Sequence, residues 1–290
     1  MSSLPRPTVD AAWLADHLDD PSLRLFDATA HLHIPDDGGE VVLRDGRETF
    51  EREHLPGARF VDLGRELSDP DAPAPFTVPS PEHAATALGH LGVGDGAYVV
   101  VYDQHQTMWA SRLWWQLRLE GHEEVAVLDG GLPAWKAAGL PTTSGPSEPY
   151  PATTFTSRRR PELVATKDDV LARLDDDRAV LINALDPATF RGEVPTYARP
   201  GHIPGSANVF FADLVDPETG RLRPADELHE RLAGSGALRD DVAVTTYCGG
   251  GIAATLDALA LAVAGRDDVA VYDGSLNEWT ADPALPLRTG

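Results

Sequence analysis

The chain has little cysteine and no long apolar run. Cys248 is the only cysteine in 290 residues, which excludes an intramolecular disulfide and a cysteine-type zinc cluster. No apolar run approaches the ~20 residues that a membrane-spanning helix needs, so no membrane contact is expected. Residues 1–7 lack the apolar segment of a signal peptide. We therefore expect a cytoplasmic protein.

Positive charge is also scarce. Lys136 and Lys167 are the only lysines, nearly all basic residues are arginines, and the formal net charge is −22. A chain this acidic repels nucleic acid and anionic membrane surfaces, so neither is expected as a partner. An anionic ligand would need a local site that offsets the field of the whole chain.

The one cysteine lies where a predicted strand turns into a predicted helix. Residues 242–247 form a short β-branched apolar run, and residues 252–264 form a helical run without glycine or proline. Three glycines follow Cys248 between the two runs. Because open α/β sheets bind ligands at the carboxyl ends of their strands, this turn is the first candidate for a functional site.

The turn after Cys248 has the chemistry of an anion site. Glycines allow several backbone N–H groups to point at one spot, and the helix start adds unpaired donors and a positive dipole end. A thiolate is favoured there, and a thiolate is a nucleophile. An isolated cysteine is more often buried and inert, but the glycine loop favours a reactive thiol here. Cys248 is therefore predicted to be the catalytic residue.

Predicted strands and helices alternate along the chain. The predicted strands cover 23–26, 97–102 and 125–128, and the predicted helices cover 82–91 and 109–119. Thr8 is a candidate N-cap for a first helix over 7–18. This alternation predicts an α/β fold with parallel, doubly wound sheets.

The second half of the chain repeats motifs of the first half at nearly constant spacing. The pairs are His54–Gly57 with His202–Gly205, Asp129–Gly131 with Asp273–Ser275, and Tyr102 with Tyr247. The repeat predicts two similar domains over 1–140 and 162–290. Residues 141–161, rich in Pro, Ser and Thr, are the predicted linker.

The two domains differ at the catalytic turn, where Asp103 takes the place of Cys248. The loop at 104–108 has no glycine and, counted from Asp103 to Asp129, one extra residue, so we expect it to form no comparable cradle of amides. The first domain is therefore predicted to be chemically silent and to cover one side of the site in the second.

His31 and His33 are a candidate pair of metal ligands. They are one residue apart, but no third ligand follows in a metal-binding pattern, so a polar loop is the favoured interpretation. We expect neither a metal nor an organic cofactor.

These features resemble the tandem rhodanese-type sulfurtransferases, which include thiosulfate and 3-mercaptopyruvate sulfurtransferases. The resemblance rests on the paired His-Leu/Ile-Pro-Gly motifs, on Cys248–Ala253 in the second half only, and on Asp273–Trp279. It covers nearly the whole chain, from about Leu14 to Leu287. It implies two rhodanese-like domains, each a doubly wound parallel sheet flanked by helices, of which the second is catalytic.

The resemblance implies a ping-pong reaction. The Cys248 thiolate attacks the outer sulfur of a small anionic donor and becomes a persulfide, which a thiophile such as cyanide, a thiol or an acceptor protein then discharges. Backbone N–H groups hold the persulfide. The residues implied are Gly249, Gly250, Gly251, Ile252 and Ala253.

The resemblance also implies that arginines bind the anionic end of the donor. Arg191 and Arg199 stand ahead of the second His-Ile-Pro-Gly motif, and a guanidinium suits a carboxylate or sulfonate. Either arginine could instead form a structural ion pair, for instance with Glu193. Asp62 matches an acidic position that faces the site in the mercaptopyruvate branch.

Departures from the family bear on the donor. Gly250 stands where the mercaptopyruvate branch carries Ser or Thr, and Phe76 stands near where that branch carries a His. The thiosulfate branch carries basic residues directly after the Cys, where this chain has glycines. Because both the hydroxyl and the His are missing, thiosulfate is the favoured donor and 3-mercaptopyruvate the second candidate.

Two other functions stay open. A Cys-loop phosphatase would need an arginine six residues after the cysteine, where this chain has Ala254, so it is disfavoured. The second is a persulfide carrier or binding module that a protein partner loads and that has no turnover of its own. It would fit a chain that offers only Arg191 and Arg199 for an anionic donor. A carrier would not turn over thiosulfate and cyanide, whereas an enzyme would.

Overall fold

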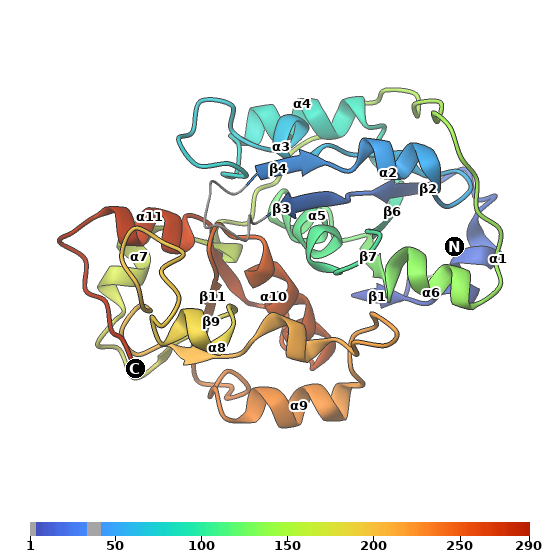
Figure 1. Ribbon diagram of the computed structural model, residues 1–290. Coiled ribbons are helices and arrows are strands. Elements are labelled where there is room, and N and C mark those ends of the chain that lie inside the picture. Colours follow the sequence, from blue (N-terminus) through green and yellow to red (C-terminus); the bar gives the residue numbers. More distant parts are fainter. Residues whose placement is uncertain (1–3, 34–41) are drawn as a thin grey trace. The chain divides into compact units, whose positions relative to one another are not determined.

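The structure contains two five-stranded sheets (Figure 1). It is a computed structural model and describes residues 4–33 and 42–290. The contacts of the chain divide it into two compact units. Unit 1 runs to residue 70 and adds 79–159 and 219–221, and unit 2 contains 71–78, 160–218 and 222–290. The predicted domain limits at 140 and 162 stay predictions.

Unit 1 contains the first sheet, a hairpin and six helices among its described residues. The strands are β1 (Thr8–Val9), β2 (Leu23–Asp27), β3 (Ala30–His33), β4 (Val42–Asp45), β5 (Arg59–Phe60), β6 (Tyr98–Tyr102) and β7 (Val125–Leu128). The helices are α1 (Ala11–His17), α2 (Arg47–Arg52), α3 (Leu63–Glu66), α4 (Pro81–His90), α5 (Met108–Leu119) and α6 (Gly131–Ala137).

Unit 2 contains the second sheet. Its strands are β8 (Val164–Ala165), β9 (Ala179–Asn183), β10 (Ala207–Asn208), β11 (Ala243–Tyr247) and β12 (Ala270–Tyr272). Its helices are α7 (Lys167–Ala172), α8 (Pro187–Phe190), α9 (Ala225–Ala233), α10 (Ala253–Val263) and α11 (Ser275–Ala281), with 3-10 turns η1 (Pro161–Leu163) and η2 (Phe211–Leu214).

The two sheets have the same topology. The strand order is β1-β7-β6-β2-β5 in the first and β8-β12-β11-β9-β10 in the second, and every neighbouring pair is parallel. Helices flank each sheet (Figure 1). The predicted α/β class with two doubly wound parallel sheets is therefore confirmed. In the first sheet the central strand β6 ends directly before Asp103, and in the second the central strand β11 ends directly before Cys248.

The repeated motifs make the same contacts in both units. His54 and His202 each stack on a phenylalanine ring, with centroids 3.9 and 3.7 Å apart, and each donates through Nδ1 to that residue's carbonyl. The hydroxyls of Tyr102 and Tyr247 each accept the backbone N–H that follows the histidine, at 3.2 and 3.1 Å. The motif thus ties the turn before the edge strand to the end of the central strand.

The apolar interior of unit 2 fixes the sheet edge that carries Cys248. On one face α10, buried over most of its length, contacts β11, β12 and α9. The other face is covered by α11 and its neighbours around the fully buried Trp279. Residues 71–78 also pack with this unit, where the Val78 N–H donates to Asp273 Oδ2 at 2.8 Å.

The start of the chain differs from the prediction. Thr8 is not an N-cap, because Thr8–Val9 forms strand β1 and pairs with β7. The helix starts at Ala11, and the Asp10 carboxylate accepts the Trp13 N–H at 2.7 Å. Both residues suit a helix cap, and the pairing of Thr8–Val9 with β7 moves the cap two residues later, from Thr8 to Asp10.

Candidate functional site

Cys248 lies at the carboxyl end of the central strand β11, between β9 and β12. Its side chain is 2% exposed, and α10 begins five residues later at Ala253. The strand therefore delivers the thiol to the sheet edge where α/β folds bind ligands, and the helix start faces it.

Ser275 holds the loop in place. Its Oγ accepts the N–H groups of Cys248 (3.1 Å) and Gly251 (3.2 Å) and donates to the Tyr272 carbonyl at 2.7 Å. Ser275 has a φ of 48°, in the left-handed region that costs a non-glycine residue about 1–2 kcal/mol. Gly131 occupies the same place in the first repeat with a φ of 54°. In the repeat that carries the cysteine, the hydrogen bonds of the Ser275 hydroxyl therefore offset the backbone strain of its positive φ.

Each of the three glycines meets a different constraint. A Cβ at Gly249 would overlap the Tyr197 hydroxyl, and a Cβ at Gly250 would lie 3.0 Å from Asn277 Nδ2. Gly251 has a φ of 75°, which side chains disfavour. The structure thus favours glycine most strongly at 249 and 251, and the neighbours of the first two glycines come from outside the loop.

The backbone amides of the loop divide into two groups. Those of Cys248 and Gly251 are bonded to Ser275, as described above. Within the described part of the chain, the N–H groups of Gly249, Gly250, Ile252 and Ala253 have no protein acceptor. Four of the five residues predicted to hold the persulfide therefore offer a free donor, and Gly251 does not.

The first repeat shows what this kind of loop does with an anion. Asp103 Oδ1 accepts the N–H groups of His105, Gln106 and Thr107 at 2.9–3.1 Å, and Oδ2 accepts those of Trp109 and Ala110 at 3.1 Å. The carboxylate is buried. The expectation that this stretch forms no amide cradle is therefore wrong: it forms one, and its own side chain fills it.

The expected extra residue in that loop is also misplaced. Helix α5 begins five residues after Asp103, just as α10 begins five residues after Cys248. The extra residue lies later, because α5 has 12 residues and α10 has 11. The left-handed Thr107, with a φ of 61°, makes the turn without glycine. The two loops are thus equal in length and differ in what fills them.

The structure does not bring Arg199 to the loop. Its guanidinium donates to four backbone carbonyls at the end of α11 and just after it, at 2.6–3.1 Å. These include carbonyls that the helix leaves without an internal partner. Arg199 therefore closes a helix end, which differs from the predicted role in donor binding.

Arg191 and Asp62 have local partners as well. Arg191 forms a two-pronged ion pair with Glu193, at 2.7 and 2.9 Å, and both side chains are exposed. The pair raises the pKa of Arg191. Asp62, in unit 1, caps α3 by accepting the Arg65 N–H at 3.1 Å. Arg191 can exchange its partner because exposed pairs are weak, so its role stays a prediction, as does that of Asp62.

Tyr197 is a site residue that the sequence did not reveal. Its hydroxyl lies over Gly249, where a side chain on that residue would otherwise sit. Burial raises the pKa of this phenol, and its electrostatic interactions with Cys248 and Asp186 raise it further. Tyr197 lies in an irregular stretch between the two arginines, without any pattern that marks it. Ser275 could have been found, since it is a hydroxyl where the first repeat has glycine.

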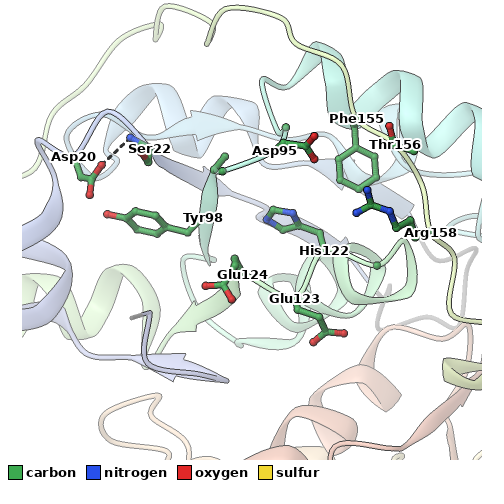
Figure 2. A pocket seen from close by; sticks show the side chains of 14 residues that line it. Asp20, Ser22, Asp95, Tyr98, His122, Glu123, Glu124, Phe155, Thr156 and Arg158 are labelled. Carbon is green, nitrogen blue, oxygen red and sulfur yellow. Dashed lines mark hydrogen bonds between the residues drawn. The ribbon is translucent and has the colours of Figure 1, made fainter. Parts of the chain in front are cut away.

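A separate pocket of about 420 Å³ lies in unit 1 (Figure 2). Tyr98, at the start of β6, and His122 point into it, and Asp20 accepts the Ser22 N–H at its margin. The pocket is thus at the amino ends of the strands. It lies at the opposite end of β6 from Asp103 and is not the counterpart of the Cys248 loop.

The predicted histidine pair is only partly described. His31 Nε2 lies 3.2 Å from Thr49 Oγ1, and its ring stacks on His105 at 5.2 Å. The side chain of His33 lies outside the described residues. Across 4–33 and 42–290, no group of three or more His, Cys, Asp or Glu side chains is arranged to hold a metal. No helix in those ranges is long and apolar enough to cross a membrane.

The chain matches the family described as "Rhodanese-like domain" over residues 10–138 and again over 166–282. It is 36% identical to the 3-mercaptopyruvate sulfurtransferase of Escherichia coli K12, over 97% of both chains. It is also 36% identical to the Homo sapiens protein of that name, over 94% of this chain and 92% of the other.

A solved structure agrees with these matches. The crystal structure of SseA from Escherichia coli superimposes with a TM-score of 0.80 at 36% identity, covering 93% of this chain and 99% of that one. Two matches to one domain family, an almost full-length relationship and the cysteine loop in the second repeat agree. The chain belongs to the rhodanese family, as a tandem rhodanese-type sulfurtransferase.

Proposed function

We propose that this sulfurtransferase takes the sulfur of 3-mercaptopyruvate onto Cys248 and passes it to a thiophilic acceptor. The observation that carries the proposal is the place of Cys248 at the end of β11, beside four uncommitted backbone amides. An anionic persulfide at that point meets preorganised donors, as the carboxylate of Asp103 does in the first repeat.

The donor in this proposal differs from the one that the sequence favoured. Thiosulfate was preferred because a hydroxyl and a histidine of the mercaptopyruvate branch are missing. The relatives named above, at 36% identity over nearly the full chain, are 3-mercaptopyruvate sulfurtransferases, and this relationship outweighs two single positions. A donor with one carboxylate also suits a loop without basic side chains better than a doubly charged one.

Each part of the loop has a task in this reaction. The thiolate of Cys248 attacks the donor sulfur, and the N–H groups of Gly249, Gly250, Ile252 and Ala253 stabilise the resulting persulfide. Ser275 fixes the backbone on either side of these donors. Arg191 is the remaining candidate to bind the donor carboxylate, by exchanging Glu193 for it.

Steady-state kinetics with cyanide as acceptor tests the donor. We expect kcat/KM to be at least about 10-fold higher with 3-mercaptopyruvate than with thiosulfate, which corresponds to about 1.4 kcal/mol of transition-state preference. A higher value with thiosulfate would return that donor to first place. No turnover with either donor would favour a carrier that a protein partner loads.

A further inference from the structure

The space beside Cys248 is filled from outside the loop. Tyr197 comes from the stretch between α8 and β10, and its ring packs on the interior cluster around Trp279. An added Cβ at Gly249 would overlap the phenol oxygen and would lie 3.0 and 3.1 Å from the ring carbons Cζ and Cε1. The hydroxyl is therefore held against the residue that directly follows the nucleophile.

This hydroxyl is an uncommitted proton donor. Within the described residues it makes no hydrogen bond, although its ring is anchored. Burial, and next the electrostatic interaction with Cys248, raise the pKa of the phenol, so it stays protonated at neutral pH. The arginines that flank it in sequence are assigned other tasks: Arg191, paired with Glu193, is the candidate for the donor carboxylate, and Arg199 closes the end of α11. The neutral phenol of Tyr197 is therefore the candidate acid beside Gly249.

We propose that Tyr197 is the proton donor of the sulfur-loading step, delivering its hydroxyl proton to the carbon that loses sulfur. This inference rests on 3-mercaptopyruvate as the donor and assigns a catalytic role within that reaction. It also accounts for glycine at position 249, since any side chain there would displace the hydroxyl.

The step balances without any outside reagent. The Cys248 thiolate forms an S–S bond to the donor thiol, and the carbon–sulfur bond breaks with its electron pair on carbon. The products are a protonated persulfide, Cys–S–SH, and the enolate of pyruvate. Tyr197 gives its proton to the enolate carbon, and the phenolate then takes the proton of the S–H group. The end state is Cys–S–S⁻, pyruvate and a neutral Tyr197.

The discharge step needs no such donor. Cyanide attacks the outer sulfur, the S–S bond breaks, and the products are thiocyanate and the Cys248 thiolate, with no proton transferred. The two half-reactions should therefore respond differently to the loss of one hydroxyl. A merely structural role of Tyr197 would slow both, because both need the loop intact.

Rapid-mixing kinetics of Tyr197→Phe tests this difference. We expect loading from 3-mercaptopyruvate to slow by about 100-fold, within the range of positioned acid catalysts, with a KM within about threefold of wild type. Discharge of the preloaded variant by cyanide should stay at the wild-type rate. Tyr98→Phe, which removes a phenol hydroxyl in unit 1, is the matched control and should load normally.

The outcomes separate this inference from the proposed function. If wild type does not load from 3-mercaptopyruvate at all, the proposed donor is wrong. If wild type loads and Tyr197→Phe loads equally fast, or if loading and discharge slow together, Tyr197 is not the proton donor.

A second pair of variants tests the placement of the hydroxyl. Gly249→Ala should slow loading at least about 10-fold in the wild-type background, because the methyl group displaces the phenol. In a Tyr197→Ala background the same substitution should cost no more than about twofold further, since the two changes remove one interaction. An equal factor in both backgrounds would show that the two residues do not act together.

Discussion

At the scale of single residues, the two repeats differ in how they fill the same loop. In the first, Asp103 supplies both the side chain and the anion, and five backbone amides bind its carboxylate. In the second, Cys248 supplies a thiol that becomes an anion only when it is deprotonated or carries sulfur. In the first repeat the side chain of the chain itself thus fills the loop, whereas in the second the proposed persulfide would fill it.

The Asp103 carboxylate should matter for stability and not for chemistry. Asp103→Ala leaves five N–H groups without this acceptor, three of them in buried hydrogen bonds, so we expect the free energy of unfolding to fall by about 3–5 kcal/mol. Chemical denaturation measures this loss. The rate of sulfur transfer per folded molecule should equal that of wild type.

Two comparisons sharpen this prediction. Asp103→Asn keeps one acceptor oxygen and should lose less stability than Asp103→Ala. Added acetate, which can enter the emptied cradle, should raise the melting temperature of Asp103→Ala more than that of wild type. A denaturation midpoint for Asp103→Ala equal to that of wild type would contradict the cradle.

At the scale of elements, helix α10 combines a functional start with an unfavourable interior residue. Its first turn directly follows the Cys248 loop, and one turn further on Asp257 is fully buried. Neither carboxyl oxygen of Asp257 has a hydrogen-bond partner among the described residues. Burial raises the pKa of this carboxyl well above its ordinary value, so the group remains protonated inside the fold.

The sign of the pH effect follows from that raised pKa. Above the ordinary carboxyl pKa, the unfolded chain releases the proton and the folded chain keeps it, so Asp257 costs more stability as the pH rises. Asp257→Ala should therefore raise the free energy of unfolding by about 1–3 kcal/mol at pH 8, with a smaller gain at pH 4.

Thermal unfolding at pH 4, 6 and 8 measures this gain. The matched control is Asp175→Ala, which removes an exposed carboxyl and should change stability by less than about 0.5 kcal/mol at each pH. Equal melting temperatures for wild type and Asp257→Ala at pH 8, or a gain that shrinks as the pH rises, would contradict this account of α10.

The elements also show which features a sequence can reveal. The strand, glycine turn and helix around Cys248 depend on local composition, and the structure has them at 243–247 and 253–263. The partners of Arg199 depend on where a distant helix ends, and no local pattern contains that information. Tyr197 was missed for the same reason, because only packing brings its hydroxyl to Gly249.

At the scale of the whole molecule, one fold occurs twice, and we propose that only the second copy carries chemistry. The repeat was visible in the sequence because motif residues such as His54 and His202 make identical turn contacts in both units. The amide cradle of the first unit was not visible, because a glycine-free stretch closes through the left-handed Thr107. In this proposal, the difference in chemistry between the two units therefore depends on the residue that follows each central strand, Asp103 or Cys248.

The most direct test of Cys248 as the reactive residue is the mass of the intact protein after exposure to 3-mercaptopyruvate. We predict that wild type gains one sulfur, ~32 Da, that cyanide removes it, and that Cys248→Ser gains nothing while keeping its fold. The same gain on Cys248→Ser would place the reactive group elsewhere. No gain on the folded wild-type protein from 3-mercaptopyruvate or thiosulfate would contradict a Cys248 persulfide as the intermediate.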